Sequence, residues 1–309
     1  MEDAVKIAAM ATDADAEVRG AAADALGSMD EAAAFPLLVN LLADPDRRVR
    51  IAAVRSLGNL RSAHAFDVLL PLLEEGDAEL TCEVLAAFAK TGDERAFAPV
   101  VVRLFDVDDA VRQNAAAAVG RLRNPSAFEP LMMCLDDDVE WVRANSALSL
   151  GQLGCVEAAS RLREIADSQD TATVRANAVT ALGELASADT GISPFLMEVA
   201  GDAAEDARVR VAAVLALASG FQELGKRDED LASRVLGIVF ALAGEEPDDD
   251  VRSTCIWALG ELCRAESVEE LGLDPAALDQ VAALLEKAQG DPHEWCARYA
   301  EEALVKVRG

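Results

Sequence analysis

Apolar positions in this chain repeat with the period of an α-helix, and the whole pattern then recurs as similar ten-residue copies. VRANSALSLG at residues 142–151 closely matches VRQNAAAAVG at 111–120 and VRANAVTALG at 174–183. Counting the first residue of a copy as position 0, apolar residues recur at positions 0, 4, 5, 8 and 11. These positions share one face of a helix with 3.6 residues per turn. Each copy therefore predicts one amphipathic helix.

The copies continue along most of the chain. The first four steps between them are 31 residues each, and the later steps are 32, 35, 42 and 45 residues. After a short turn, each copy is followed by a second apolar stretch, such as AFDVLLPLLEEGD at 65–77. A proline often stands near the start of this stretch, where a helix tolerates one. Each repeat thus predicts two antiparallel helices, an A helix and then a B helix that carries the Val-Arg pair. The copies begin at Val18, Val49, Leu80, Val111, Val142, Val174, Val209, Val251 and Cys296.

One helical hairpin cannot bury its apolar face alone, whereas a stack of hairpins can. We therefore predict an all-α solenoid of about nine two-helix repeats that forms a single domain over residues 1–309. Its repeats should be regular over 1–186 and longer and irregular over 187–309. Glycine at position 9 lowers helix propensity by about 1 kcal/mol, so it predicts a close contact that a side chain would block. These glycines are Gly27, Gly58, Gly120, Gly151, Gly183 and Gly260.

An arginine recurs at position 1, and an acidic residue stands six positions before it. An aspartate in this turn can cap the B helix, and its carboxylate can accept hydrogen bonds from an arginine of its own or of the next repeat. We interpret the set as a structural ladder, with ligand binding by the arginines as the alternative. In the third repeat Glu75 precedes Thr81, so the arginine is lost. The pairs are Asp13 and Arg19, Asp44 and Arg50, Asp106 and Arg112, and Asp137 and Arg143.

The V-R-x-x-A-A-x-A-L-G pattern with its preceding aspartate resembles the HEAT-repeat family, in the short variant related to phycobilin lyase subunits. The resemblance covers residues from about 3 to 307. It implies a right-handed superhelix whose A helices lie outside and whose B helices line a concave surface. Lyase-type members attach bilins to antenna proteins, and some similar haloarchaeal proteins act in signalling to the motility motor.

The residues offer little for catalysis. The two histidines, His64 and His293, are too few for a three-histidine zinc site, and no phosphate-binding glycine motif is present. HEAT-type deoxyhypusine hydroxylases carry His-Glu dyads at positions 2 and 3, and no copy here has one. The pair His293-Glu294 lies three residues before its own position 0. We therefore expect no catalytic residue, no metal and no cofactor, with a lyase-type role as an open alternative.

The charge of the chain is strongly acidic, with 56 Asp and Glu against 28 Lys and Arg and a formal net charge of −28. Such a surface stays soluble in molar salt and indicates a halophilic, archaeal source. It also repels phosphate backbones, so nucleic acid is not an expected partner. Without a long apolar run or a signal-like start, we expect a cytoplasmic protein that is monomeric and does not bind membranes. The six cysteines are not expected to form disulfides, and Cys134 and Cys255 occupy core positions.

Positions 2, 3, 6 and 10 vary between copies and should line the concave surface. Asn114, Asn145 and Asn177 share position 3, beside Gln113, and could bind an extended peptide or hold the stack together. Position 6 becomes apolar toward the C-terminus at Leu148, Leu215 and Trp257, with Val211 at position 2 of the same surface. These apolar residues are either a partner-binding patch or buried by curvature.

Other features concern the ends of the repeats. Trp141 and Trp295 at position −1 are interpreted as packing at the edge. Insertions at 221–233 and 263–275 are either binding loops or adjusted packing. The sequence as a whole predicts a non-catalytic scaffold or adaptor that binds a protein partner, of unknown identity, on its concave face. The alternatives are a lyase-type chromophore or cofactor attachment subunit and an adaptor in haloarchaeal motility signalling.

Overall fold

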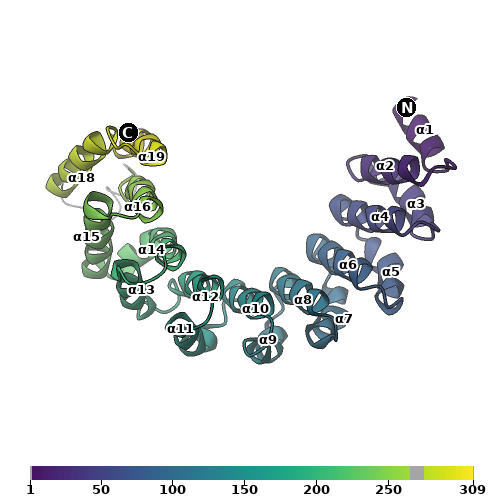
Figure 1. Cartoon of the computed structure of the whole chain (residues 1–309), viewed down its shortest axis with the longest axis horizontal. Helices are drawn as coiled ribbons and strands as arrows, with labels where there is room; N and C mark the ends of the chain where they lie inside the picture. The colour runs from purple at the N-terminus through teal and green to yellow at the C-terminus, as the bar shows by residue number, and fades with distance from the viewer. Residues whose placement is uncertain (1, 265–274, 309) are drawn as a thin grey trace. The chain divides into compact units, whose positions relative to one another are not determined.

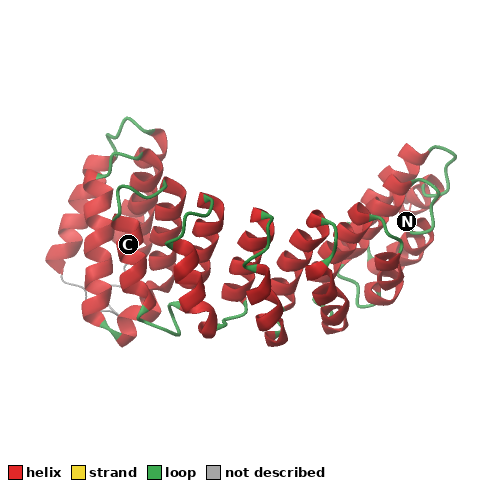
Figure 2. Ribbon diagram, turned by 60° about the horizontal axis from the view of Figure 1, so that its bottom comes forward, coloured by secondary structure: helices red, strands yellow, loops and turns green. Residues whose placement is uncertain are grey.

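The structure is a computed structural model that describes residues 2–264 and 275–308, and helices and loops alone make up that part of the chain (Figures 1 and 2). Its contacts divide the chain into an N-terminal unit, Met1–Ser149, and a C-terminal unit, Leu150–Gly309. The predicted all-α class is confirmed. Within the described ranges, no helix is long and apolar enough to cross a membrane.

In the N-terminal unit, the A helices lie on one side and the B helices on the other (Figure 1). The helices on the A side are often short, and they include both α-helices and 3₁₀-helices. The B helices are α2 (Ala16–Leu26), α4 (Arg47–Leu60), α6 (Ala78–Thr91), α8 (Asp109–Leu122) and most of α10 (Glu140–Gln152). The A side has α1 (Glu2–Met10), α3 (Glu31–Leu41), α5 (Ala65–Leu69), η1 (Leu70–Glu74), η2 (Glu94–Ala96), α7 (Phe97–Val102), η3 (Arg103–Phe105), η4 (Pro125–Ala127) and α9 (Phe128–Cys134).

The C-terminal unit repeats the same two layers with longer helices. Its B helices are α12 (Ala172–Leu185), α14 (Ala207–Arg227), α16 (Asp249–Leu262) and α19 (Glu294–Arg308). Its A side has η5 (Val156–Ala158), α11 (Ala159–Ala166), α13 (Ile192–Gly201), α15 (Glu229–Glu245) and α18 (Pro275–Ala288).

The periodic apolar positions form the core, as predicted. In α12 all five of them are at most 1% exposed, namely Val174, Ala178, Val179, Leu182 and Leu185. Most B helices begin after an aspartate whose carboxylate accepts a hydrogen bond from the first turn, as Asp46 does from the N–H of Arg48 at 2.8 Å. Cys134 and Cys255 are buried, at 4% and 0% exposure, which confirms their place in the core.

Glycine at position 9 lets consecutive B helices approach closely, which confirms the predicted close contact for five of the six glycines. A Cβ atom on Gly58 would lie 2.8 Å from Cα of Ala87, and one on Gly151 would lie 2.6 Å from Cα of Ala181. Gly27, Gly183 and Gly260 make the same kind of contact with the next B helix. In each case the neighbour is a small residue at position 7, so a pair of small residues sets the helix spacing.

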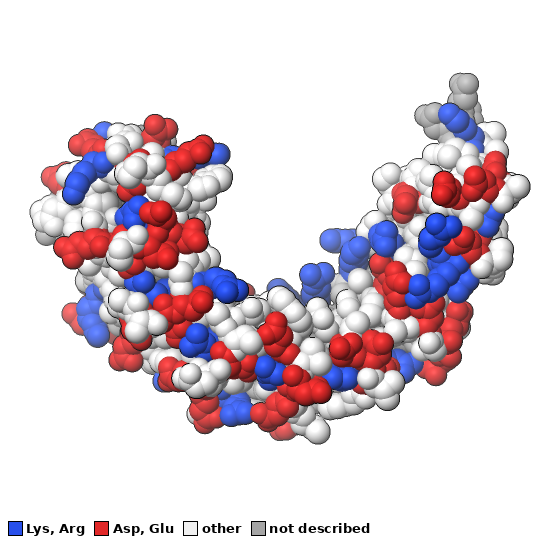
Figure 3. All heavy atoms as spheres, viewed as in Figure 1, with Lys and Arg blue, Asp and Glu red and all other residues white. Residues whose placement is uncertain are grey.

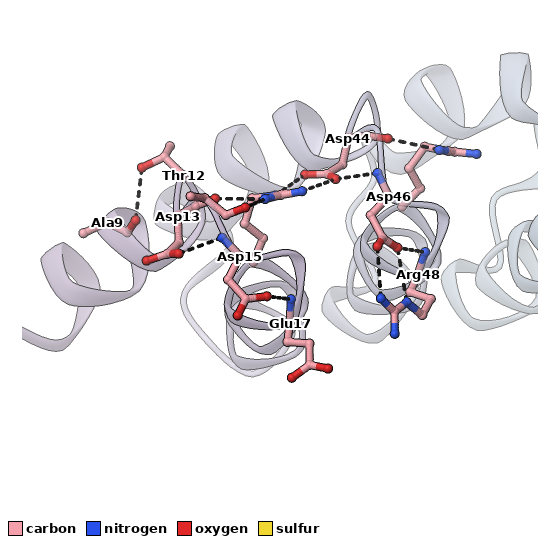
Figure 4. A network of polar contacts seen from close by, with 11 residues as sticks. Ala9, Thr12, Asp13, Asp15, Glu17, Asp44, Asp46 and Arg48 are labelled. Atoms are coloured by element: carbon pink, nitrogen blue, oxygen red, sulfur yellow. Dashed lines mark hydrogen bonds and ion pairs between the residues drawn. The ribbon is translucent and has the colours of Figure 1, made fainter.

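Acidic side chains spread widely over the surface seen in Figure 3, and the arginine ladder uses some of them. Arg19 donates from Nε and Nη2 to the carboxylate of Asp44 in the next repeat, at 2.6 and 2.8 Å. Its Nη1 donates at 2.9 Å to the backbone carbonyl of Asp13 in its own repeat (Figure 4). Arg112 makes the same two contacts, with the carboxylate of Asp137 and the carbonyl of Asp106. Each such arginine therefore links consecutive repeats through a bidentate, charge-assisted pair.

The prediction that the ladder aspartates cap the B helices is wrong. Asp44 accepts a hydrogen bond from the N–H of Asp46 at 2.9 Å, and it is Asp46 that caps α4. Asp13, Asp106 and Asp137 likewise accept from the N–H two residues on. Asp13, Asp44 and Asp106 thus shape the turn, while the aspartate two residues on, Asp15, Asp46 or Asp108, caps the helix. Arg143 donates to the carbonyls of Asp137 and Asp138, at 2.7 and 3.1 Å.

The ladder is interrupted at the third repeat. Arg50 donates to the carbonyl of Asp44 at 3.0 Å, but its buried Nε has no partner, and the acid of the next repeat, Glu75, is exposed. Thr81, which replaces the arginine, is 4% exposed, and Asp106 pairs instead with Arg103 at 3.5 Å. Arg47 bridges the same two repeats from the surface, through Asp77 and Glu79.

Acid should weaken the stack through this ladder. The Arg19 guanidinium, and with it the N–H of Asp46, holds the pKa of the Asp44 carboxyl below its usual range, and Arg47 lowers the pKa of Asp77 to about 2. A folded-state pKa below the unfolded one gives stability that is present above about pH 4 and is lost as the pH falls through the folded value. We expect Asp44→Asn to lower the free energy of unfolding by about 2 kcal/mol at pH 7. The difference from wild type should shrink between about pH 4 and pH 2.

Urea unfolding at a series of pH values measures this effect. Glu129→Gln is the control, because Glu129 is exposed and pairs with no cation among the described residues. Glu129→Gln should change the free energy of unfolding only slightly, and this change should not follow the pH dependence expected for Asp44→Asn. A constant difference between Asp44→Asn and wild type at all pH values would refute the role of the ladder.

The first insertion forms no loop, so its interpretation as a binding loop is wrong. Residues 221–227 extend α14, and residues 229–233 begin α15, with Asp228 between the two helices capping α15. Most of the second insertion, 265–274, lies outside the described residues. All six cysteines are free thiols.

Candidate protein-interaction surface

The candidate surface is the exposed side of the B helices of the C-terminal unit, α12, α14, α16 and α19, which we call the C-terminal B-helix face. The inner sides of these helices pack on the A layer, and the ladder joins them at their N-terminal ends. Arg175 pairs with Glu205 at 2.8 Å, and Arg252 pairs with Asp291 at 3.1 Å. The exposed positions 2, 3, 6 and 10 are therefore held on a rigid frame.

Three hollows open on this face, each between neighbouring B helices. The hollow between α12 and α14 has a volume of about 420 Å³, and its lining includes Leu215, Thr180 and Glu184. The hollow between α14 and α16, of about 220 Å³, is lined by Phe221 and Trp257 among others. A third hollow of about 410 Å³ involves α14, α16 and α19. Each offers room for one or two side chains of a partner.

Three of the four apolar residues that the sequence placed on the concave surface each line a different hollow of this face. Leu215 lies in the first hollow and is 43% exposed, Trp257 lies in the second and is half-buried, and Val211 lies in the third. The alternative that curvature buries them does not hold for Leu215. An exposed leucine and accessible aromatic rings are the kind of anchors that protein partners use.

The third hollow contains an aromatic pair that the sequence analysis missed. Trp295, expected to pack at the edge, is 48% exposed, and its ring lies 5.7 Å from that of Tyr299. The Arg298 guanidinium lies 5.3 Å from the Trp295 ring centre, at a distance typical of a cation–π contact. Both rings line the hollow with Val211. The sequence could have predicted this pair, because Trp295 and Tyr299 are four residues apart and therefore share one helix face.

Charged groups border the hollows and are mostly paired. Glu261, in the second hollow, accepts from Lys306 at 2.6 Å and from Arg264 at 2.5 Å. Arg208 and Asp250 border the third hollow. The face therefore combines apolar floors with a polar rim, the arrangement typical of protein interfaces.

The asparagine row consists of residues whose amide groups are already in use. Asn145 donates at 3.1 Å to the backbone carbonyl of Gln113 in the preceding B helix, and Asn114 donates at 2.8 Å to the carbonyl of Ala110 in its own helix. Asn177 is half-buried in α12 and is likewise engaged by neighbours. The Asn145 bond joins two repeats and favours the stack-stabilising role, one of the two predicted, whereas the Asn114 bond stays within one helix. Leu148 is half-buried in α10, in the N-terminal unit.

Comparison with known proteins identifies the repeat. The family model described as HEAT repeats matches residues 4–87, 66–151, 98–183 and 159–260. No curated protein matches the sequence.

Several solved structures are similar in fold. A chain of the Kap95:Nup1 complex gives a TM-score of 0.66 at 15% identity over 98% of this chain and 46% of its own, so this protein spans less than half of that chain. An engineered protein gives 0.50 at 20% identity, with both chains fully covered. The complex of CpcE and CpcF of phycocyanin lyase from Nostoc sp. PCC7120 gives 0.50 at 18% identity, over 81% of this chain and 94% of that one. At these identities the likeness shows the fold alone.

Proposed function

We propose, from the premise that this chain belongs to the HEAT-repeat family, that it is a non-catalytic scaffold that binds a partner protein on its C-terminal B-helix face. The observation that carries the proposal is the row of three hollows with Leu215, Trp257 and the Trp295–Tyr299 pair at their surfaces. We place this scaffold, as a monomer, in the cytoplasm.

The geometry suits an elongated protein segment better than a single small molecule. The hollows lie between successive helices, and packed helices are about 10 Å apart, so one segment would cross several of them. Each hollow would take one or two side chains, and the rim would supply hydrogen bonds. Two of the similar solved structures are complexes between proteins, which agrees with this use of the fold.

Removing the exposed anchors should strongly weaken capture of the partner. We expect the variant Leu215→Ser/Trp295→Ala to bind its partner at least tenfold more weakly, since a buried tryptophan anchor commonly contributes about 2 kcal/mol or more. The measurement is affinity capture from a lysate of the source organism with mass spectrometry and absorbance, followed by titration with the purified partner.

The matched control is Val107→Ser/Trp141→Ala. It removes the same kinds of side chain at exposed sites of the N-terminal unit, where Val107 is 99% and Trp141 47% exposed. This control should bind like wild type, and both variants should keep the wild-type circular dichroism. Equal capture by all three proteins would refute the proposed face. A coloured eluate without a protein partner would instead favour the lyase-type function, and a partner from motility signalling would support the narrower adaptor role.

A further inference from the structure

Basic side chains without acidic partners gather in the N-terminal unit. Elsewhere in the described chain most arginines pair with carboxylates, as expected when acidic residues outnumber basic ones 56 to 28. Arg61, Arg121 and Arg123 make neither an ion pair nor a side-chain hydrogen bond to any described residue, and all three are exposed. Among the described residues, Lys90 donates only to the side-chain amide oxygen of Asn59, at 2.9 Å. Figure 3 shows Lys and Arg side chains gathered on the B-helix side of α4, α6 and α8.

These four residues lie at the C-terminal ends of three consecutive B helices, and we call them the basic strip. Lys90 and Arg121 occupy position 10 of α6 and α8, and Arg61 and Arg123 are the C-caps of α4 and α8. The Lys90 side chain runs back to α4, where its Nζ bonds Asn59, two residues before Arg61. With about 10 Å between neighbouring helices, the strip is about 20 Å long. That is the length of about six residues of extended chain.

Two arginines of the strip occupy a backbone conformation that favours glycine. Arg61 has φ 51° and ψ 37°, and Arg123 has φ 52° and ψ 35°, both in the left-handed region. The corresponding residues of the neighbouring repeats are Gly92 and Gly154, with φ of 66° and 69°. Glycine is the usual residue at this point after a helix, because a side chain is strained there. The attraction between a cation and the C-terminal end of the helix dipole does not explain these arginines, because α6 ends with glycine at the same position.

The turns that follow these arginines carry no acid. Arg61 precedes Ser-Ala-His-Ala at 62–65, and Arg123 precedes Asn-Pro-Ser-Ala at 124–127. Gly92, by contrast, precedes Asp93 and Glu94. The carboxylate of Asp93 is already paired with Arg95 at 2.7 Å, and Glu83 of α6 is paired with Arg55 at 2.8 Å. The positive charge of the strip is thus left uncompensated by its own fold. Strained, exposed and unpaired residues of this kind are typical of binding sites.

We propose that the basic strip binds a carboxylate-rich, extended segment of a partner protein. Arginine accepts a carboxylate through two parallel hydrogen bonds, and the length of the strip fits a short run of Asp and Glu. Charges interact strongly only within about 8–10 Å at moderate salt, so a short segment meets the local positive field. A nucleic acid would extend onto the acidic surface of a chain with net charge −28 and be repelled there. This surface is independent of the C-terminal B-helix face.

Replacing the two strained arginines by glycine should weaken binding of the acidic segment and raise the stability of the fold, so the two effects can be told apart. We expect Arg61→Gly/Arg123→Gly to bind a fluorescent oligoglutamate of about twelve residues about tenfold more weakly, as measured by anisotropy at low salt with the full chain. The same variant should melt at a higher temperature, because glycine relieves the left-handed strain. Arg61→Lys/Arg123→Lys should keep most of the binding, and a matching oligoglutamine should not bind wild type.

The matched control, Arg234→Gln/Lys287→Gln in the C-terminal unit, removes two other exposed cations that form no ion pair with a described residue. It should change the affinity for oligoglutamate less than twofold. The proposal is overturned if wild type does not bind oligoglutamate, or if the glycine variant binds as wild type does. It is equally overturned if the control loses as much affinity as the glycine variant, or if an oligothymidylate of the same length binds more tightly than the peptide.

Discussion

Replacing Glu246 by glutamine is expected to lower the free energy of unfolding by about 3 kcal/mol or more, because it leaves Arg210 buried without its counter-charge. Both side chains are only 4% exposed. Arg210 donates from Nη1 to Oε1 of Glu246 at 3.0 Å and from Nη2 to Oε2, while its Nε donates to the carbonyl of Ala200 at 3.1 Å. Glu246 also accepts from the N–H of Asp248 at 3.1 Å. Among the ladder pairs described above, this one is the most deeply buried.

Two further variants test the cause of the loss. Arg210→Met/Glu246→Leu removes both charges together and should unfold close to wild type or above it, because no lone charge remains in the core. Glu302→Gln breaks the exposed pair with Arg298, whose side chains are 48% and 61% exposed, and should change stability by less than about 1 kcal/mol. Urea unfolding followed by circular dichroism measures all of them. If Glu246→Gln is no less stable than Glu302→Gln, the buried pair does not hold α14 to the next repeat.

Replacing Gly183 by alanine should destabilise the C-terminal unit by about 2 kcal/mol, although alanine is the better helix former. A Cβ atom at Gly183 would lie 2.4 Å from Cβ of Ala216 and 3.0 Å from its Cα. The helices α12 and α14 would have to move apart to accommodate it. Gly183 and Leu215 line the same hollow, so this close approach also sets the width of the proposed binding face.

A compensating change distinguishes this contact from a general effect of alanine. Adding Ala216→Gly to Gly183→Ala removes the colliding Cβ and should restore about half of the lost stability, since glycine in the helix itself costs about 1 kcal/mol. Gly237→Ala, in the middle of α15 with no atom within 4 Å of the added Cβ, should instead stabilise by about 1 kcal/mol. Thermal unfolding of the four variants, Ala216→Gly alone included, gives the coupling energy. Strictly additive effects would show that the two residues do not restrain each other.

The two predictions concern the two devices that join one B helix to the next. The close glycine contact fixes the distance between helices, and the arginine pair fixes how their N-terminal ends are placed. Together they hold positions 2, 3, 6 and 10 in a constant arrangement. A binding face made of residues from several repeats needs a fixed placement of neighbouring helices, because its hollows lie between them.

The sequence by itself determined the helices, the repeat and the core. The 3.6-residue period of apolar positions depends only on which side of each helix is buried, so Val174, Ala178 and Leu182 could be placed in the core from their spacing. Glycine at position 9 predicted a close contact for a similar local reason, since its loss of helix propensity had to be offset by packing. Cys134 and Cys255 were assigned to the core by comparison with other repeats.

Only the tertiary structure decided which groups meet across repeats. It showed that Arg19 pairs with the carboxylate of Asp44 in the next repeat and uses only the backbone of Asp13 in its own. It also showed Trp295 on the surface and the insertion after Gly220 as helix. The left-handed backbone of Arg61 and Arg123 likewise became visible only in the fold. The periodic pattern records burial along one helix but not the separation and offset of neighbouring helices, and that placement decides pairing and exposure.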